Sequence, residues 1–269
     1  MSAGSDPALP RSLMDLAAGL AVEAGRLART GRASGVDEVD TKTTVTDMVT
    51  EYDRAAEALI VGRLRAERPD DAIVGEEGTA DPGTSGIRWL VDPIDGTTNF
   101  LYQLPTYSVS IAALDADGGL AGAVYVPMLD ELFTATRGGG AQLNGRPIHC
   151  SPQQTLGATL VATGFSYLPE RRTLQARRLV GLIDRVRDIR RLGSAALDLC
   201  YVAAGRFDAY YEQYLNPWDL AAGELIAREA GAEVGSFDGG PLEPAGLVAA
   251  APAVFESLVR LLEGAPALP

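Results

Sequence analysis

The segment DPIDGT at residues 92–97 combines residue types that could bind a cation and a phosphate group. Asp92 and Asp95 supply carboxylates, which repel each other at close quarters unless a cation lies between them, and oxygen ligands favour Mg²⁺ or Mn²⁺. Gly96 leaves its backbone N–H accessible to a ligand. Thr97 begins what could be a short helix, and a helix N-terminus binds phosphate through its free N–H groups. Taken alone, the segment also fits a simple turn.

Two short buried strands are expected to position these carboxylates. The apolar runs at residues 72–75 and 88–91 both end in acidic residues, with Glu76 and Glu77 after the first and Asp92 after the second. Buried backbone emerges into a loop at the end of each strand. This placement groups Glu76 with Asp92 as candidate cation ligands.

The remaining elements are expected to alternate between helix and strand. Apolar spacing predicts helices at residues 12–30, 46–68, 171–186, 194–204 and 218–230. Ser12 and Asp15 resemble a capping pair for the first helix, and Gly31 is expected to follow its end. Strand patterns and turn signals predict strands at residues 108–114, 120–127, 131–136, 142–149, 159–164, 189–192 and 207–211. The fold class is α/β, and the simplest division is an α+β unit at residues 1–150 and an α/β unit at residues 151–269.

The residues that the chain lacks exclude several common catalytic sites. It has no Gly-x-Ser-x-Gly motif, no Gly-Lys pair for a phosphate-binding loop, and a single histidine, His149. His149 and Cys150 would point to opposite faces of a strand, so they form a poor catalytic pair. Cys150 and Cys200 are expected to be structural thiols, and the usual zinc ligands are missing. Catalysis would therefore depend on carboxylates, hydroxyls and hard metal ions.

The charge balance also limits the classes of partner. With 36 acidic and 23 basic residues, the net charge is −13, which repels nucleic-acid phosphates, so direct nucleic-acid binding is not expected. The apolar stretch at residues 247–255 is too short to span a membrane. The first ten residues lack a signal-peptide pattern and are expected to form a loose leader. These features predict a cytoplasmic protein.

Two longer motifs resemble the signatures of the inositol monophosphatase family. The first is WLVDPIDGTTNF at residues 89–100, and the second is WDLAAG at residues 218–223, continuing to EAG at residues 229–231. Three further positions match in the right order, within about residues 40–250: the Gly-Glu-Glu step at residues 75–77, Lys42 and Asp53. Lys42 is the only lysine in the chain. A position in such a site would explain why a lysine occurs there instead of an arginine.

The resemblance implies a layered α-β-α-β-α sandwich and a set of metal ligands. It assigns a first Mg²⁺ to Glu76, Asp92 and the carbonyl oxygen of Ile94, and a second to Asp92, Asp95 and Asp219. A weaker third ion would lie near Glu76. Asp219 falls near the start of the helix expected at residues 218–230, where the helix dipole favours an ionised carboxylate. A helix N-cap is the alternative role for Asp219, and the two roles can coexist.

The family also implies how water and phosphate are handled. Thr97, supported by Asp53, would position and activate the attacking water together with Glu76. Gly96 and Thr97 would donate backbone N–H groups to the phosphate, and Lys42 would lie near the metal site. Family members commonly form homodimers, and lithium inhibits many of them.

The alcohol side of the substrate is expected to meet the second half of the chain. The segment RLGSAALDLC at residues 191–200, which contains Gly193, Ser194 and Ala195, resembles the part that lines this side in the family. Glu212 matches a glutamate that contacts inositol hydroxyls, although it could also be a surface charge at a strand edge. The pattern departs from many relatives at residues 216–217, so the resemblance does not predict which residues form the outer rim of the pocket.

Three functions remain open at this point. The first is a phosphatase of inositol 1-phosphate and similar polyol monophosphates. The second has the same chemistry with histidinol phosphate, fructose 1,6-bisphosphate or a 3′-phosphoadenosine compound, and Glu212 or Asp198 could contact the amine of histidinol phosphate. The third is a binding role, because SuhB-like bacterial members of the family associate with RNA polymerase.

Overall fold

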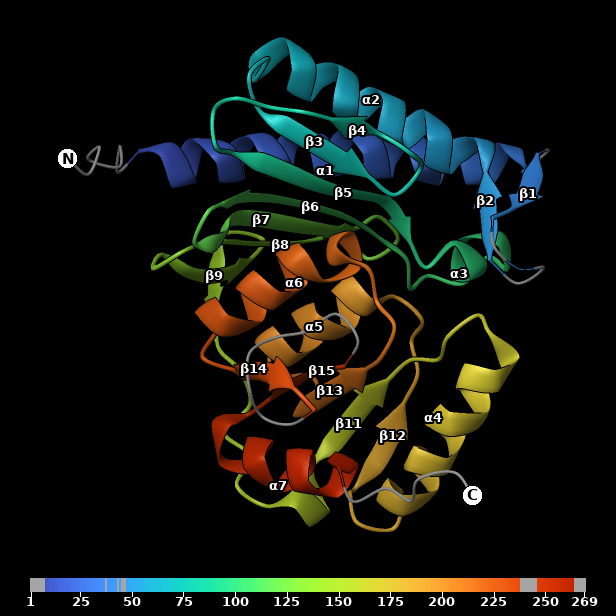
Figure 1. The fold of residues 1–269 in the computed structure, drawn as a ribbon, viewed down its shortest axis with the longest axis vertical. Helices are drawn as coiled ribbons and strands as arrows, with labels where there is room; N and C mark the ends of the chain where they lie inside the picture. The colour runs from blue at the N-terminus through green and yellow to red at the C-terminus, as the bar shows by residue number, and fades with distance from the viewer. Residues whose placement is uncertain (1–7, 37, 43, 45–46, 238–245, 264–269) are drawn as a thin grey trace.

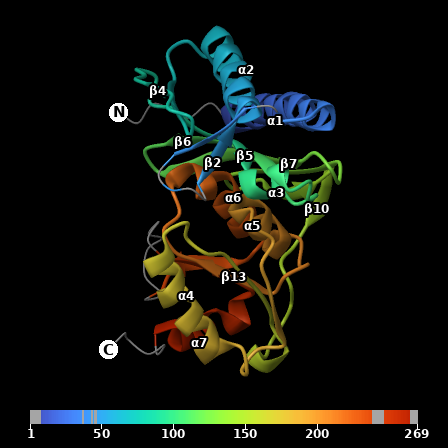
Figure 2. The ribbon, with the colours of Figure 1, turned by 90° about the vertical axis from the view of Figure 1, so that its right-hand side faces the viewer.

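The computed structural model describes residues 8–36, 38–42, 44, 47–237 and 246–263. Its elements are stacked as helix, sheet, helix, sheet and helix layers, as Figures 1 and 2 show from two directions. This arrangement confirms the expected α/β sandwich.

The first sheet has eight strands in the order β10-β9-β8-β7-β6-β5-β3-β4. Its strands are β3 (Ala72–Gly75), β4 (Ala80–Asp81), β5 (Arg88–Asp95), β6 (Ser108–Asp115), β7 (Gly118–Val126), β8 (Glu131–Thr136), β9 (Gly140–Leu143) and β10 (Arg146–Ile148). Helices α1 (Leu9–Ser34) and α2 (Glu51–Glu67) cover one face. Alternation along β5 separates the two faces, because Trp89 and Val91 pack with α1 and α2 while Leu90 packs on the opposite side.

Helices α5 (Ala195–Ala203) and α6 (Pro217–Glu229) fill the layer between the two sheets. Their apolar side chains share one core with the first sheet and another with the second, so the central layer is buried on both sides. The chain crosses from the first sheet to the second between β10 and β11, near the division predicted at residue 150.

The second sheet has five strands in the order β12-β11-β13-β15-β14. They are β11 (Leu160–Thr163), β12 (Asp188–Arg190), β13 (Ala209–Glu212), β14 (Glu233–Ser236) and β15 (Leu247–Ala250). The remaining elements are the hairpin β1 (Val39–Thr41) and β2 (Met48–Thr50), the short helices α3 (Thr97–Leu101) and η1 (Leu156–Ala158), and the outer helices α4 (Pro169–Leu182) and α7 (Pro252–Glu263).

Two pairs of parallel strands bring distant segments to common sheet edges. Strands β3 and β5 are parallel neighbours, with Gly75 opposite Val91, so Glu76 and the acidic end of β5 emerge together. Strands β11 and β13 are also parallel neighbours, with Thr163 opposite Tyr211. The loop after β11 and the carboxyl end of β13 therefore leave the second sheet at one edge.

The prediction for the first helix is correct in position and too short. The helix runs from Leu9 to Ser34, with Pro10 in its first turn and no side-chain cap, so Ser12 and Asp15 are not its capping pair. Leu9 and Pro10 therefore do not belong to a loose leader, while residues 1–7 lie outside the described residues. Gly31 lies inside the helix, where a Cβ would overlap the ring of Tyr52. A tertiary contact, not a helix end, explains this glycine.

The second helix begins later than predicted. Residues 48–50 form strand β2, and α2 starts at Glu51 because the Thr50 side chain caps it by accepting the N–H groups of Tyr52 and Asp53. The predicted start at residue 46 falls outside the described residues. No predicted element covers β14, β15 or α7. Among the described residues, no helix is long and apolar enough to cross a lipid bilayer.

Candidate active site

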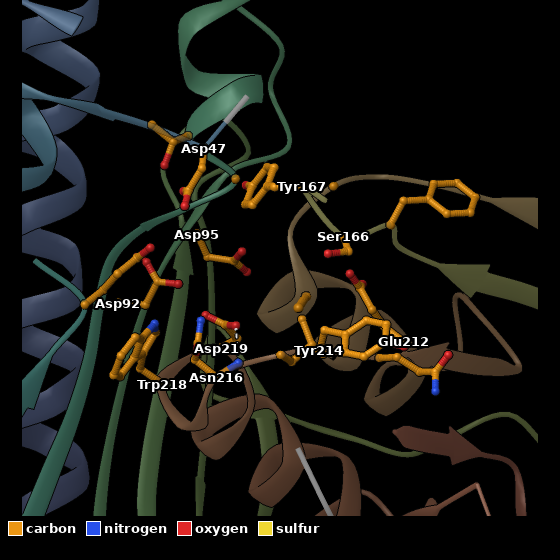
Figure 3. A pocket seen from close by; sticks show the side chains of 18 of the residues that line it. Asp47, Asp92, Asp95, Ser166, Tyr167, Glu212, Tyr214, Asn216, Trp218 and Asp219 are labelled. Carbon is orange, nitrogen blue, oxygen red and sulfur yellow. Dashed lines mark hydrogen bonds between the residues drawn. The ribbon is translucent and has the colours of Figure 1, made fainter. Parts of the chain in front are cut away.

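A pocket of about 530 Å³ lies where the edges of the two sheets approach each other. Asp92 and Asp95 of β5 and Asp219 of α6 point into it, and Glu212 lies across it (Figure 3). Of the residues that the sequence singled out, the following line the pocket: Lys42, Glu76, Asp92, Ile94, Asp95, Gly96, Thr97, Gly193, Ala195, Glu212 and Asp219.

Asp95 joins the two halves of the chain. Its Oδ2 accepts hydrogen bonds from the hydroxyl of Ser194 and the backbone N–H of Ala196, both at 2.7 Å, at the start of α5. Burial raises the pKa of Asp95 to about 6, and these two bonds act in the opposite direction. Ser194, predicted to line the pocket, is instead buried behind Asp95 and also contacts the hydroxyl of Ser108 at 3.1 Å.

Asp92 and Asp219 are acidic groups held in a strongly negative environment. Burial and the charges of Glu76, Asp95 and Asp219 raise the pKa of Asp92 well above its usual value. Burial and the charges of Asp95 and Glu76 do the same for Asp219. Oδ2 of Asp219 also accepts the backbone N–H of Asn216 at 2.6 Å, so this residue closes the first turn of α6 as well as lining the pocket.

The donor set fits a hard divalent cation. Glu76, Asp92, Asp95 and Asp219 all border one pocket, and carboxylates crowded in this way need positive charge between them. Within the described residues, no three acidic side chains already converge as the shell of a single ion.

Thr97 lies between the carbonyl of Ile94 and the carboxylate of Asp53. Its Oγ1 is 3.2 Å from each of these acceptors. Asp53 is fully buried behind Thr97 and accepts the N–H and hydroxyl of Thr50 at the start of α2. Burial raises the pKa of Asp53 to about 6, while the bonds from Thr50 lower it. The capping residue of α2 thus also orients the group behind Thr97.

Lys42 forms ion pairs with both glutamates that follow β3. Its Nζ lies 2.8 Å from Oε1 of Glu76 and 2.5 Å from Oε1 of Glu77. Burial lowers the pKa of Lys42, but the charges and hydrogen bonds of the glutamates outweigh it and raise this pKa. Burial raises the pKa of Glu77 to about 7. The only lysine therefore holds the loop that carries Glu76.

Gly96 occupies a backbone position that only glycine adopts easily. Its φ is 94°, and a Cβ there would lie 2.9 Å from the carbonyl oxygen of Gly193. It precedes the first turn of α3, where backbone N–H groups have no intrahelical acceptor. The close approach to Gly193 therefore places the open amides of this turn beside the second half of the chain.

On the side of the pocket that is expected to bind the alcohol, Tyr210 and Gly164 contact the carboxylate of Glu212. Its Oε2 accepts the hydroxyl of Tyr210 at 2.6 Å, and a Cβ at Gly164 would overlap its carboxylate. Burial raises the pKa of Glu212 to about 7. Asp198, a candidate for contact with a substrate amine, does not line the pocket. Its carboxylate is buried without a hydrogen-bond partner in the described residues, and burial raises its pKa well above the usual value.

One wall of the pocket consists of residues that no sequence motif predicts. The additional lining residues come from the loop after β11, from α4 and from the segment after β13: Phe165, Ser166, Tyr167, Leu168, Arg171, Gln213, Tyr214 and Leu215. No local motif marks them. The available signal was the pair of strand patterns at residues 159–164 and 207–211, since the carboxyl ends of neighbouring parallel strands commonly border a ligand site.

Comparison with known proteins gives consistent results. The sequence pattern of the Inositol monophosphatase family matches residues 10–266. Nus factor SuhB of Escherichia coli (strain K12) is 48% identical over 196 residues, covering 72% of this chain and 73% of that protein. Inositol-1-monophosphatase of Mycobacterium leprae (strain TN) is 43% identical over 274 residues, covering 94% of each chain. The crystal structure of extragenic suppressor protein suhB from Bartonella henselae matches with a TM-score of 0.90 at 37% identity, covering 95% of this chain and 100% of that one. This chain therefore belongs to the inositol monophosphatase family.

Proposed function

We propose that this protein is a magnesium-dependent phosphatase that hydrolyses inositol 1-phosphate or similar polyol monophosphates. The observation that carries the proposal is the placement of Asp92, Asp95 and Asp219 on one side of a pocket with Glu212 on the other. The similarity to Inositol-1-monophosphatase of Mycobacterium leprae supports the substrate class.

The metal ligands are proposed from the residues that border the pocket. Glu76, Asp92 and the carbonyl of Ile94 would hold one Mg²⁺, and Asp92, Asp95 and Asp219 a second. Bound Mg²⁺ would neutralise phosphate charge and make a nearby water more acidic. Because the carboxylates do not yet converge, we expect small side-chain rotations when the ions bind. Mn²⁺ is expected to substitute.

The protein's own groups would orient the reactants. Thr97 has one hydroxyl proton, so donation to Asp53 leaves its oxygen to accept a hydrogen bond from the attacking water. The N–H groups of Gly96 and Thr97 would bind the phosphate oxygens. Glu212 would accept hydrogen bonds from hydroxyl groups of the alcohol, which fixes the leaving group before the P–O bond breaks.

A substrate panel tests the activity. Phosphate release is measured with inositol 1-phosphate, histidinol phosphate, fructose 1,6-bisphosphate and a 3′-phosphoadenosine compound, with magnesium, with a chelator, and with lithium. We expect turnover that requires magnesium and falls with lithium. Asp95→Asn should nearly abolish turnover while the circular dichroism spectrum stays native. A normal rate for this variant at limiting magnesium would refute the two-metal assignment, and no turnover of any compound would refute the activity.

A second candidate function is association with the transcription machinery. It is favoured by the similarity to Nus factor SuhB of Escherichia coli. The test is co-purification of the wild-type protein and of Asp95→Asn with RNA polymerase. Equal retention of both proteins would support a role independent of catalysis, and retention of neither would exclude it. We also propose a homodimer, as the family resemblance implies, which light scattering after size exclusion tests directly.

A further inference from the structure

Helix α2 directs two buried carboxylates toward the segments that carry the candidate metal ligands. Asp53 and Glu57 are four positions apart, so they lie on one face of the helix. Asp53 is fully buried, and Glu57 is 4% exposed. Asp53 contacts Thr97 after β5, whereas Glu57 contacts the turn that follows β3. One face of α2 therefore supports both of the loops that leave these neighbouring strands at the pocket.

The carboxylate of Glu57 accepts hydrogen bonds from three donors of the turn at residues 76–79. Its Oε2 accepts the backbone N–H of Glu77 at 2.8 Å. Its Oε1 accepts the hydroxyl of Thr79 at 2.7 Å and the backbone N–H of Thr79 at 3.2 Å. Hydrogen bonds to an ionised acceptor are stronger than those between neutral groups. Glu57 therefore determines the direction in which the backbone N–H groups of this turn point.

Gly75, at the end of β3, makes room for this carboxylate. A Cβ at Gly75 would lie 2.3 Å from Oε2 of Glu57, so the carboxylate occupies the space that a side chain would need. This contact explains the glycine of the Gly-Glu-Glu step. The next residue, Glu76, donates its backbone N–H to the carbonyl oxygen of Val91 on β5 at 3.1 Å. The backbone of Glu76 is thus fixed to β5 directly, and to α2 through the N–H of Glu77.

We propose that Glu57 is a positioning residue for the first metal site: by holding the turn at residues 76–79, it keeps the carboxylate of Glu76 facing the pocket as a ligand for Mg²⁺. Glu76 lines the pocket and Glu57 does not, so Glu57 acts through the turn and not by contact with an ion. The ion pair of Lys42 with Glu76 holds only side-chain atoms and leaves the backbone to Glu57. The inference rests on the proposed function, in which Glu76 is a metal ligand.

The test is calorimetric titration of the wild type and of Glu57→Gln with Mg²⁺ in the absence of substrate. Glutamine has the shape of glutamate, but its amide nitrogen donates hydrogen bonds, so it cannot accept on both sides of the turn. We expect the Kd for Mg²⁺ to rise about tenfold or more, as when a ligand loses its supporting hydrogen bonds. The magnesium concentration for half-maximal activity should rise similarly, with kcat at saturating magnesium near the wild-type value. An unchanged Kd would overturn the inference.

Two further variants separate positioning from a general loss of stability. Asp71, just before the start of β3, is also 4% exposed, so Asp71→Asn alters an equally buried carboxylate at the other end of the strand. It should lower stability and leave the Kd for Mg²⁺ unchanged; a rise equal to that of Glu57→Gln would overturn the inference. Thr79→Val removes one donor and should raise the Kd. Combined with Glu57→Gln, it should add little, because both changes break one contact.

Titration without substrate also separates this inference from the phosphatase activity. If Mg²⁺ binds and Glu57→Gln weakens its binding, but the wild type hydrolyses no phosphate ester, only the activity is rejected. If the wild type is active and Glu57→Gln binds Mg²⁺ equally well, only the inference is rejected. A wild-type protein that binds no Mg²⁺ would reject both.

Discussion

The hydroxyl oxygen of Thr97 lies 3.2 Å from Oδ1 of Asp53, a residue 44 positions earlier in the chain on the first turn of α2. Thr97 itself starts α3 and lines the pocket, while Asp53 is fully buried behind it. The pair joins the outer helix layer to the reaction site. Its geometry suits a hydroxyl that donates a hydrogen bond to Asp53 and leaves its oxygen free to accept one from water.

Replacing Thr97 by valine should lower kcat without unfolding the protein. Valine keeps the shape of threonine but cannot accept a hydrogen bond from water, so we expect kcat for inositol 1-phosphate to fall by about 100-fold or more. Thr97→Ser should keep much of the activity. Thr98→Val is the control, because Thr98 does not line the pocket. An unchanged kcat for Thr97→Val would remove the hydroxyl from the mechanism.

Asp53 should make the metal-free protein less stable as pH rises. Its pKa of about 6 in the folded protein exceeds the ordinary 3.8, so the folded state holds this proton more tightly than the unfolded state. The stabilisation is complete below about pH 4 and is lost as pH rises through about 6, a change of about 3 kcal/mol.

Asp53→Asn cannot lose that proton and tests this effect. Urea unfolding with a chelator should show the free energy of unfolding of the wild type falling by about 3 kcal/mol more than that of Asp53→Asn between pH 4 and pH 8. Asp15→Asn, at an exposed position of α1, should follow the wild type. Parallel curves for the wild type and Asp53→Asn would show that this carboxyl is not perturbed by burial.

Ser194→Ala should raise the magnesium concentration needed for half-maximal activity. The serine hydroxyl donates to Oδ2 of Asp95 at 2.7 Å, and loss of such an orienting bond typically weakens a metal site by about tenfold or more. The rate at saturating magnesium should recover much of its wild-type value. Ser110→Ala, at a position of β6 that is equally buried, is a suitable control. A lowered saturated rate with unchanged magnesium dependence would argue against an orienting role.

Glu212→Gln should discriminate among substrates. The carboxylate lines the pocket and is held by Tyr210, so its loss should lower kcat/KM for inositol 1-phosphate by about tenfold at pH 8, where Glu212 is ionised. Compounds without matching hydroxyls should be affected less. Tyr210→Phe tests the support for Glu212 separately. An equal loss for every substrate would deny Glu212 a specificity role.

The elements that follow from local pattern could be predicted from the sequence. The strand at residues 72–75 matches β3, and the strand at residues 131–136 matches β8. Both carry continuous apolar or alternating runs between clear turn signals. Residue types and strand ends indicated Glu76 and the segment at residues 92–97, although Asp-x-x-Asp-Gly alone also forms turns. The other pocket residues were found only because longer motifs resemble a family: Lys42, Gly193, Ala195, Glu212 and Asp219.

What could not be predicted depends on tertiary contacts. Apolar spacing predicted that α2 starts at residue 46, but the side chain of Thr50 caps the helix, which therefore begins at Glu51. Ser194 was expected in the pocket, but only the approach of α5 to β5 shows that its hydroxyl contacts Asp95. Arg171 and Tyr214 carry no motif, because a cation over a ring arises from the packing of α4 against a loop about 40 residues later.

Because α4 is attached to the pocket through polar side chains, the range of substrates can change during evolution without a change in the hydrolytic residues. Asp92 and Asp95 on β5 and Asp219 on α6 sit in elements that pack in the cores of the fold, whereas α4 is held by hydrogen bonds of Gln175 and Arg178 to the loops after β11 and β13. Substitutions on the α4 wall of the pocket could alter which alcohols enter while the hydrolytic residues stay in place. A laboratory library confined to positions 171 and 214, which line the pocket, would therefore sample new substrate ranges while Gln175 and Arg178 keep the helix in place.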